Sequence, residues 1–201
     1  MNTQAPVRRA ILRPGVNLEH LRVRPARIRH ARRVAEMSVR IGRRLRLDAG
    51  FLEDLEEAVP LHDIGKLMVP AWILDKRGPL SEYERALMQT HTLAGGRLLR
   101  ATGEPTLELA AEIAESHHER WDGGGYPHGL REKEIPLGAR IVAVADVFDA
   151  LLHERPYKPA WPRRTAVNKV VANSGSQFDP EVVEAFARCA ASSRLAGRGR
   201  A

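Results

Sequence analysis

Five of the eight histidines in this sequence, together with two aspartates, stand in a pattern that could hold metal ions. Along the chain they read H, HD, H, HH and D, and the full set is His30, His62, Asp63, His91, His117, His118 and Asp146. Adjacent residues on a helix point about 100° apart, so a doublet at a helix end can wrap around one metal ion or bridge two. Imidazole nitrogens and carboxylate oxygens suit iron, manganese or zinc. The pattern therefore predicts a metal-dependent hydrolase.

The alternative interpretation of each histidine is a hydrogen-bonded core residue, which is the more common case for a histidine taken singly. That interpretation does not explain the whole set. Asp146 lies inside the apolar run 140–149, where an unpaired carboxylate would be costly to bury. We expect the three remaining histidines, His20, His128 and His153, to be ordinary surface or loop residues.

Apolar positions follow helical spacing through most of the chain, and no segment shows the alternation of a strand. We expect helices over 28–47, 51–64, 70–75, 81–100, 105–118, 136–152, 162–173 and 180–190. Ser81 and Glu84 have the spacing of a capping box at the start of the helix that contains His91. Pro60 should distort the last turn before the HD doublet, and Gly65 is expected to stop that helix. The predicted fold class is all-α, a single helical bundle with a metal centre in its core.

The net charge of +7 is concentrated at the two ends of the 201-residue chain. The first 29 residues hold seven arginines and one glutamate, and the last eight hold three arginines. We expect a largely irregular, arginine-rich segment over 1–27, a catalytic domain over 28–192 and a basic tail over 193–201. Because the body of the chain carries no positive excess, specific nucleic-acid binding is not expected.

The sequence shows no sign of a membrane or secretory segment. No apolar run approaches the roughly 18 residues of a membrane span, and the N-terminus lacks the apolar stretch of a signal peptide. Cys189 is the single cysteine, which excludes an internal disulfide. These features predict a protein without a membrane span, located in the reducing cytoplasm.

Five segments of the chain carry a resemblance to a known family. HDIGK, THTLAGGRLL, HHERWDGGGYP, IPLGARIVAVADVFDAL and RPYK occur in the order and spacing of the HD-GYP family, from about His30 to Phe186. That family is a branch of the HD-domain phosphohydrolases. The resemblance implies an HD-domain bundle that hydrolyses cyclic di-GMP to the linear dinucleotide pGpG, with further conversion to GMP left open. It also implies two divalent transition metals, iron or manganese, and a metal-bridging hydroxide as the attacking group.

The resemblance also implies a role for individual residues. One metal ion would be held by His30, His62, Asp63 and Asp146, and the second by His91, His117 and His118, with Asp63 as the bridge. Lys66 would contact the scissile phosphate and be catalytic together with Asp63. Relatives with three metal ions carry a glutamate four residues before the first histidine. This chain has Ala26 there, which implies two ions.

The remaining implied roles concern the substrate. Phosphate oxygens would be held by Arg155 and Lys158, and the substrate pocket would be shaped by the loop of Gly125, Tyr126 and Pro127. Glu119 and Asp122 either orient the metal ligands or cap that loop.

Two other functions fit the same residues. One is a phosphodiesterase for another cyclic dinucleotide, such as cyclic GMP-AMP. The other is a non-catalytic cyclic-dinucleotide sensor or scaffold that docks onto protein partners in second-messenger signalling. Hydrolysis agrees with the residue chemistry, because two metal ions neutralise phosphate charge and basic side chains add charge-assisted hydrogen bonds.

Overall fold

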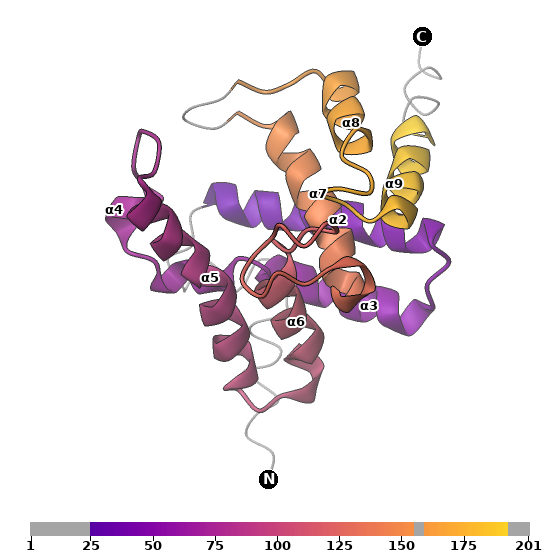
Figure 1. Ribbon diagram of the computed structural model, residues 1–201. Helices are drawn as coiled ribbons and strands as arrows, with labels where there is room; N and C mark the ends of the chain where they lie inside the picture. Colours follow the sequence, from indigo (N-terminus) through magenta and orange to yellow (C-terminus); the bar gives the residue numbers. More distant parts are fainter. Residues whose placement is uncertain (1–24, 155–158, 193–201) are drawn as a thin grey trace.

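The computed structural model describes residues 25–154 and 159–192, which form helices joined by loops (Figure 1). The α-helices are α2 (Pro25–Arg44), α3 (Ala49–Ala58), α4 (Ala71–Leu74), α5 (Glu82–Arg100), α6 (Glu108–Ser116), α7 (Leu137–Leu152), α8 (Arg163–Val171) and α9 (Pro180–Ser192). Four 3-10 helices lie between them, η1 (Val59–Leu61), η2 (Ile64–Met68), η3 (Pro105–Leu107) and η4 (Glu132–Glu134). Among these residues there is no strand, only an isolated bridge between Ser174 and Phe178. The all-α prediction is confirmed.

The other helices are arranged around α2. It packs against α3, α7, α9 and η1, and Figure 1 shows it crossing the molecule with α8 and α9 on one side and α5 and α6 on the other. Its inward face carries Val34 and Ile41, both fully buried. The core continues through Phe148 of α7 and Phe186 of α9, whose rings meet edge-on with centroids 4.8 Å apart. His30, on α2, is therefore held by a helix that is packed on several sides.

Most predicted helices are present, with their ends shifted by a few residues. The helix expected over 28–47 is α2, which begins at Pro25 and ends at Arg44. The boundary placed after residue 27 thus falls inside α2, and the last three residues of the 1–27 segment are helical rather than irregular. Ser81 and Glu84 form the predicted capping box. The rest of the N-terminal segment and the tail over 193–201 lie outside the described residues.

The segment before the HD doublet differs from the single helix expected over 51–64. The α-helix α3 ends at Ala58, and the tighter turn η1 follows with Pro60 inside it. Proline has no amide hydrogen and its ring clashes with the preceding turn, which accounts for the end of the α-helix at this point. His62 and Asp63 consequently lie at the junction between η1 and η2.

Gly65 has a packing role, and the prediction that it stops a helix was wrong. It is buried within η2, which packs against α5. A Cβ at this position would lie 1.9 Å from the carbonyl oxygen of His91 and 2.5 Å from the amide nitrogen of Gly95. Only a residue without a side chain permits such an approach. The contact places the HD doublet beside His91.

The described helices include none that has both the length and the apolar character needed to cross a membrane. Cys189 is buried in α9, where its thiol donates a hydrogen bond to the backbone carbonyl of Arg40 at 3.3 Å. The single cysteine thus joins α9 to α2.

We expect Gly65→Ala to lower the free energy of unfolding by about 1–3 kcal/mol, because the added methyl group collides with the backbone of α5. Metal content should fall as well, since relief of the collision moves Asp63 away from His91. Thermal unfolding and metal analysis measure the two effects. Gly78→Ala is the matched control, because nothing lies within 4 Å of its added methyl group. Equal stability of the two variants would contradict the packing role.

Candidate metal centre

The seven predicted ligands, which are scattered along the sequence, lie together in the fold. The contributions are His30 from α2, His62 and Asp63 from the η1–η2 junction, His91 from α5, His117 and His118 from the end of α6, and Asp146 from α7. Their candidate ligand atoms form two groups, each within 4.8 Å, namely Asp63, His91, His117 and His118 in one and His30, His62 and Asp146 in the other. His128 and His153 lie outside both groups, as predicted.

Asp63 lies between the two groups and faces both. Its Oδ2 is 3.6 Å from Nε2 of His62. Its Oδ1 is 3.4 Å from Nε2 of His91 and 3.8 Å from Nε2 of His117. One oxygen is therefore directed to each group, which is the arrangement that a bridging carboxylate requires.

Three of the histidines are oriented by the backbone. His62, His91 and His117 each place Nδ1 at a carbonyl oxygen three residues earlier, at distances of 2.8, 2.7 and 3.0 Å. A carbonyl oxygen only accepts hydrogen bonds, so Nδ1 carries the proton in each ring and Nε2 keeps its lone pair. Each ring thus presents a potential ligand atom to the centre.

These ligand atoms have no partner within the protein. Among the described residues, five buried side-chain atoms lack a hydrogen-bond partner, and four belong to this centre: Nε2 of His62, His91 and His117, and Oδ1 of Asp63. Leaving a buried polar atom unpaired costs about 1–3 kcal/mol. Neutral imidazoles and a carboxylate are ligands of divalent transition metals, which would satisfy all four atoms at once. The donor set fits a divalent metal centre.

The electrostatic environment favours the ligand form of Asp63 and of the three histidines grouped with it. Burial lowers the pKa of His91, lowers that of His117 much further, and brings that of His118 to about 4. Burial alone would raise the pKa of Asp63, but Lys66 and the neighbouring histidines outweigh it and hold that pKa well below its usual value. The imidazoles of His91, His117 and His118 are therefore neutral and the carboxylate of Asp63 is charged near neutral pH, as metal binding requires.

His30 is oriented by a carboxylate instead of the backbone. Its Nδ1 lies 2.7 Å from Oδ2 of Asp149, and its Nε2 lies 3.1 Å from Oδ1 of Asp146. Arg33 donates two hydrogen bonds to Asp149, at 2.6 and 2.9 Å. Burial lowers the pKa of His30, but the two carboxylates outweigh it and raise that pKa to about 9. A carboxylate on the nitrogen that does not bind metal fixes the ring and increases its basicity.

Asp149 and Arg33 are the residues of this site that the sequence analysis missed. A signal for them was present in the spacing. Asp149 follows Asp146 by three residues on α7, and Arg33 follows His30 by three residues on α2. Residues three apart share a helix face, so each pair points to the same neighbour.

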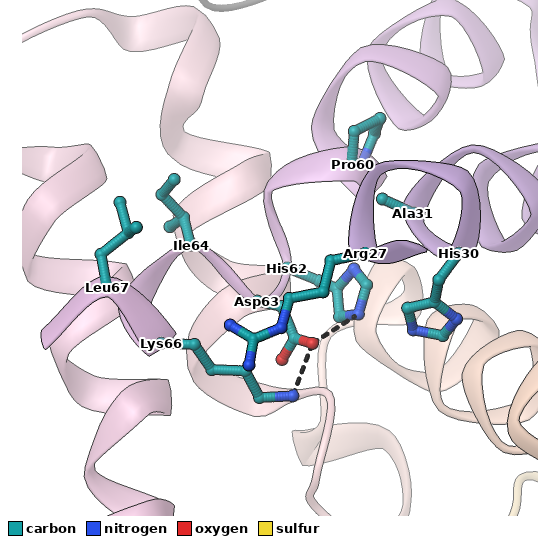
Figure 2. A pocket seen from close by; sticks show the side chains of 9 residues that line it. All are labelled: Arg27, His30, Ala31, Pro60, His62, Asp63, Ile64, Lys66 and Leu67. Carbon is teal, nitrogen blue, oxygen red and sulfur yellow. Dashed lines mark hydrogen bonds and ion pairs between the residues drawn. The ribbon is translucent and has the colours of Figure 1, made fainter. Parts of the chain in front are cut away.

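Lys66 lies beside the proposed bridge. Its Nζ pairs with Oδ2 of Asp63 at 2.6 Å, as the dashed line in Figure 2 shows. Lys66 also lines a pocket that contains His30 and His62. The pocket gives a ligand access to this side of the centre, and the phosphate contact of Lys66 stays a prediction.

The loop that contains the GYP sequence folds onto the centre. The ring of Tyr126 stacks on that of His118, with centroids 4.9 Å apart. Gly125 approaches the preceding chain so closely that a Cβ would lie 2.5 Å from Cα of Glu119. The buried carboxylate of Glu119 accepts hydrogen bonds from the amides of residues 128–130. Of the two roles expected for Glu119, the structure shows the one that organises the loop.

Of the four remaining predicted residues of this region, the structure describes two, Pro127 and Asp122. Pro127 follows Tyr126 in the loop and is half-buried. Asp122 pairs with Arg120 at 2.6 Å at the surface and accepts a hydrogen bond from a loop amide, so it also serves the loop. Arg155 and Lys158 lie outside the described residues, and their phosphate contacts stay predictions.

The fold and the site together define an all-helical protein with a candidate two-part metal centre built around HD and HH doublets. A family model described as "HD domain" matches residues 18–182, and the chain belongs to this family, in its HD-GYP branch.

Named relatives agree with that assignment. The chain is 48% identical over 158 residues to a cyclic di-GMP phosphodiesterase of Thermotoga maritima, covering 79% of this chain and 43% of the relative. It is 40% identical over 155 residues to the 3'3'-cGAMP-specific phosphodiesterase 2 of Vibrio cholerae, covering 77% and 30%. The crystal structure of a cyclic GMP-AMP specific phosphodiesterase of V. cholerae matches with a TM-score of 0.63 and 25% identity, covering 85% of this chain and 46% of that one. This chain spans less than half the length of these relatives.

We expect Asp149→Asn to weaken metal binding about 10- to 100-fold, the usual effect of losing the carboxylate behind a ligating histidine. The amide keeps the size of the side chain but removes the charge that orients His30. Competition with a chelator of known affinity measures the change. Asp122→Asn, which removes a carboxylate outside both ligand groups, is the control. If both variants bind metal as tightly as the unaltered chain, Asp149 serves only to pair with Arg33.

Proposed function

We propose that this protein is a metal-dependent phosphodiesterase that hydrolyses cyclic di-GMP to pGpG. The observation that supports this most is the convergence of four unpartnered ligand atoms around Asp63, between two groups of histidines. Two adjacent cation sites suit a phosphodiester, whose negative oxygens repel an attacking hydroxide. The 48% identity to a cyclic di-GMP phosphodiesterase supports the choice of substrate.

The residues would share the work as follows. One ion would be held by His30, His62 and Asp146, the second by His91, His117 and His118, and Asp63 would bridge them. When bound, two divalent ions would neutralise phosphate charge and lower the pKa of bound water. Lys66 would donate a charge-assisted hydrogen bond to a phosphate oxygen from the pocket side. Gly125, Tyr126 and Pro127 would border the substrate beside His118, while Asp149 keeps His30 in position.

The second candidate substrate is 3'3'-cGAMP, which the 40% identity to a phosphodiesterase specific for it favours. The metal centre acts on the phosphate, so it does not distinguish one purine base from another. A non-catalytic sensor or scaffold is less favoured, because all seven ligand positions carry ligand side chains that face a common centre. Iron or manganese as the metal, a cytoplasmic location and protein partners in signalling stay predictions.

The test of this function is turnover of cyclic di-GMP and of 3'3'-cGAMP, supplied separately to the full chain loaded with Mn²⁺ or Fe²⁺. We expect pGpG from cyclic di-GMP, identified by chromatography. The double variant His62→Ala, Asp63→Ala should lose turnover and metal together, because it lacks a terminal ligand and the bridge. Faster turnover of 3'3'-cGAMP would move the assignment to that substrate. A fully loaded chain that hydrolyses neither would favour the sensor.

We expect two metal ions per chain. Ala26 stands one turn before His30 on α2, is exposed, and has no ligand atom. Two ions suffice for one diester cleavage, so pGpG should accumulate and its conversion to GMP should be slow. Elemental analysis of the Mn²⁺-loaded chain measures the number of ions, with Ala26→Glu as the comparison that supplies a carboxylate at this position. Three ions in the unaltered chain would contradict the prediction.

A further inference from the structure

Arg27 lies beside the candidate metal centre and has no role in the function proposed above. It stands in the first turn of α2, three residues before His30, so the two side chains share a helix face. Its side chain lines the same pocket as His62, Asp63 and Lys66. Figure 2 shows Arg27 reaching from α2 toward Lys66 and Asp63, with its guanidinium group directed into the pocket.

The guanidinium group of Arg27 has no ion-pair partner among the described residues. Lys66 already pairs with Asp63, the carboxylate of this pocket, at 2.6 Å. Within residues 25–154 and 159–192, no hydrogen bond or ion pair joins the side chain of Arg27 to another residue. The pocket wall is otherwise apolar apart from two histidines, and it includes Ala31, Pro60, Ile64 and Leu67. A half-buried guanidinium near apolar walls attracts an anion more strongly than one in bulk water does.

We propose that Arg27 binds phosphate oxygens of the substrate, together with Lys66. The inference rests on the proposed function, because it takes the substrate to be a phosphodiester. The planar fork of a guanidinium matches two phosphate oxygens, whereas an ammonium group acts as a point charge. Arg27 comes from α2 and Lys66 from η2, so the two cations approach the anion from separate elements on the open side of the centre.

Arg29 provides the matched comparison for this role. It stands two residues further along α2, about 200° around the helix from Arg27. It is exposed and does not line the pocket. Arg29→Ala therefore removes the same side chain and the same charge from the same helix, but on its outer face.

The experiment compares the full chain with Arg27→Ala, Arg27→Lys and Arg29→Ala, all loaded with Mn²⁺. Calorimetry measures the Kd for inorganic phosphate, while metal analysis and the melting temperature report on the centre and the fold. We expect Arg27→Ala to weaken phosphate binding about 10- to 100-fold, with metal content and melting temperature unchanged. Arg27→Lys should recover part of the loss, because it keeps the charge without the fork. Arg29→Ala should bind phosphate as the unaltered chain does.

Kinetics supply the second measurement. The kcat/KM for cyclic di-GMP should fall by a similar factor in Arg27→Ala and should stay unchanged in Arg29→Ala. Equal phosphate affinities of Arg27→Ala and Arg29→Ala would overturn the inference, whether or not the chain hydrolyses cyclic di-GMP. Loss of metal from Arg27→Ala would also overturn it, because Arg27 would then support the centre itself. Weaker phosphate binding by Arg27→Ala, in a chain that hydrolyses no cyclic dinucleotide, would keep the inference and reject only the proposed function.

Discussion

Four buried ligand atoms meet around Asp63 without a hydrogen-bond partner, and this arrangement is costly for the polypeptide alone. The cost falls on the folded state, because water would solvate the same atoms in the unfolded chain. Hydrogen bonds from Nδ1 to backbone carbonyls hold the rings of His62, His91 and His117 in this arrangement, so the rings cannot easily turn toward other partners. A bound cation would remove the cost, which links the stability of the fold to the occupancy of the centre.

The histidines of the centre are supported in two ways, and the two ligand groups also differ in charge. Neutral carbonyl groups orient the buried rings around Asp63, whereas the charged pair of Asp149 and Arg33 orients His30. The group that contains His30 also has a carboxylate of its own, Asp146. An ion on that side would therefore meet more negative charge than an ion on the side of His91, where the shared Asp63 is the one carboxylate of the group.

The sequence could predict the candidate ligands and the helices because both depend on local patterns. Doublets of ligand residues and the helical spacing of apolar positions can be recognised without knowing which elements pack together in space. The role of Gly65 was not predictable, because it depends on which helix passes beside it. Asp146 and Asp149 occupy the same apolar run, so the sequence does not show which of them is the ligand candidate. In the structure Asp146 lies at Nε2 of His30, whereas Asp149 lies at Nδ1 of the same ring and pairs with Arg33. Arg27 likewise looked like one more charge of a basic end until α2 placed it in the pocket.

The order of the ligands along the chain has a consequence for protein synthesis. Asp63, His91, His117 and His118 are all made before α7 begins. The group that contains His30 is completed only by Asp146, and its supporting residue Asp149 follows His30 by 119 positions. Because the chain is synthesised from its N-terminus, the full ligand set exists only after α7 has been made. The group of His30, His62 and Asp146 is therefore complete only once α7 has packed against α2.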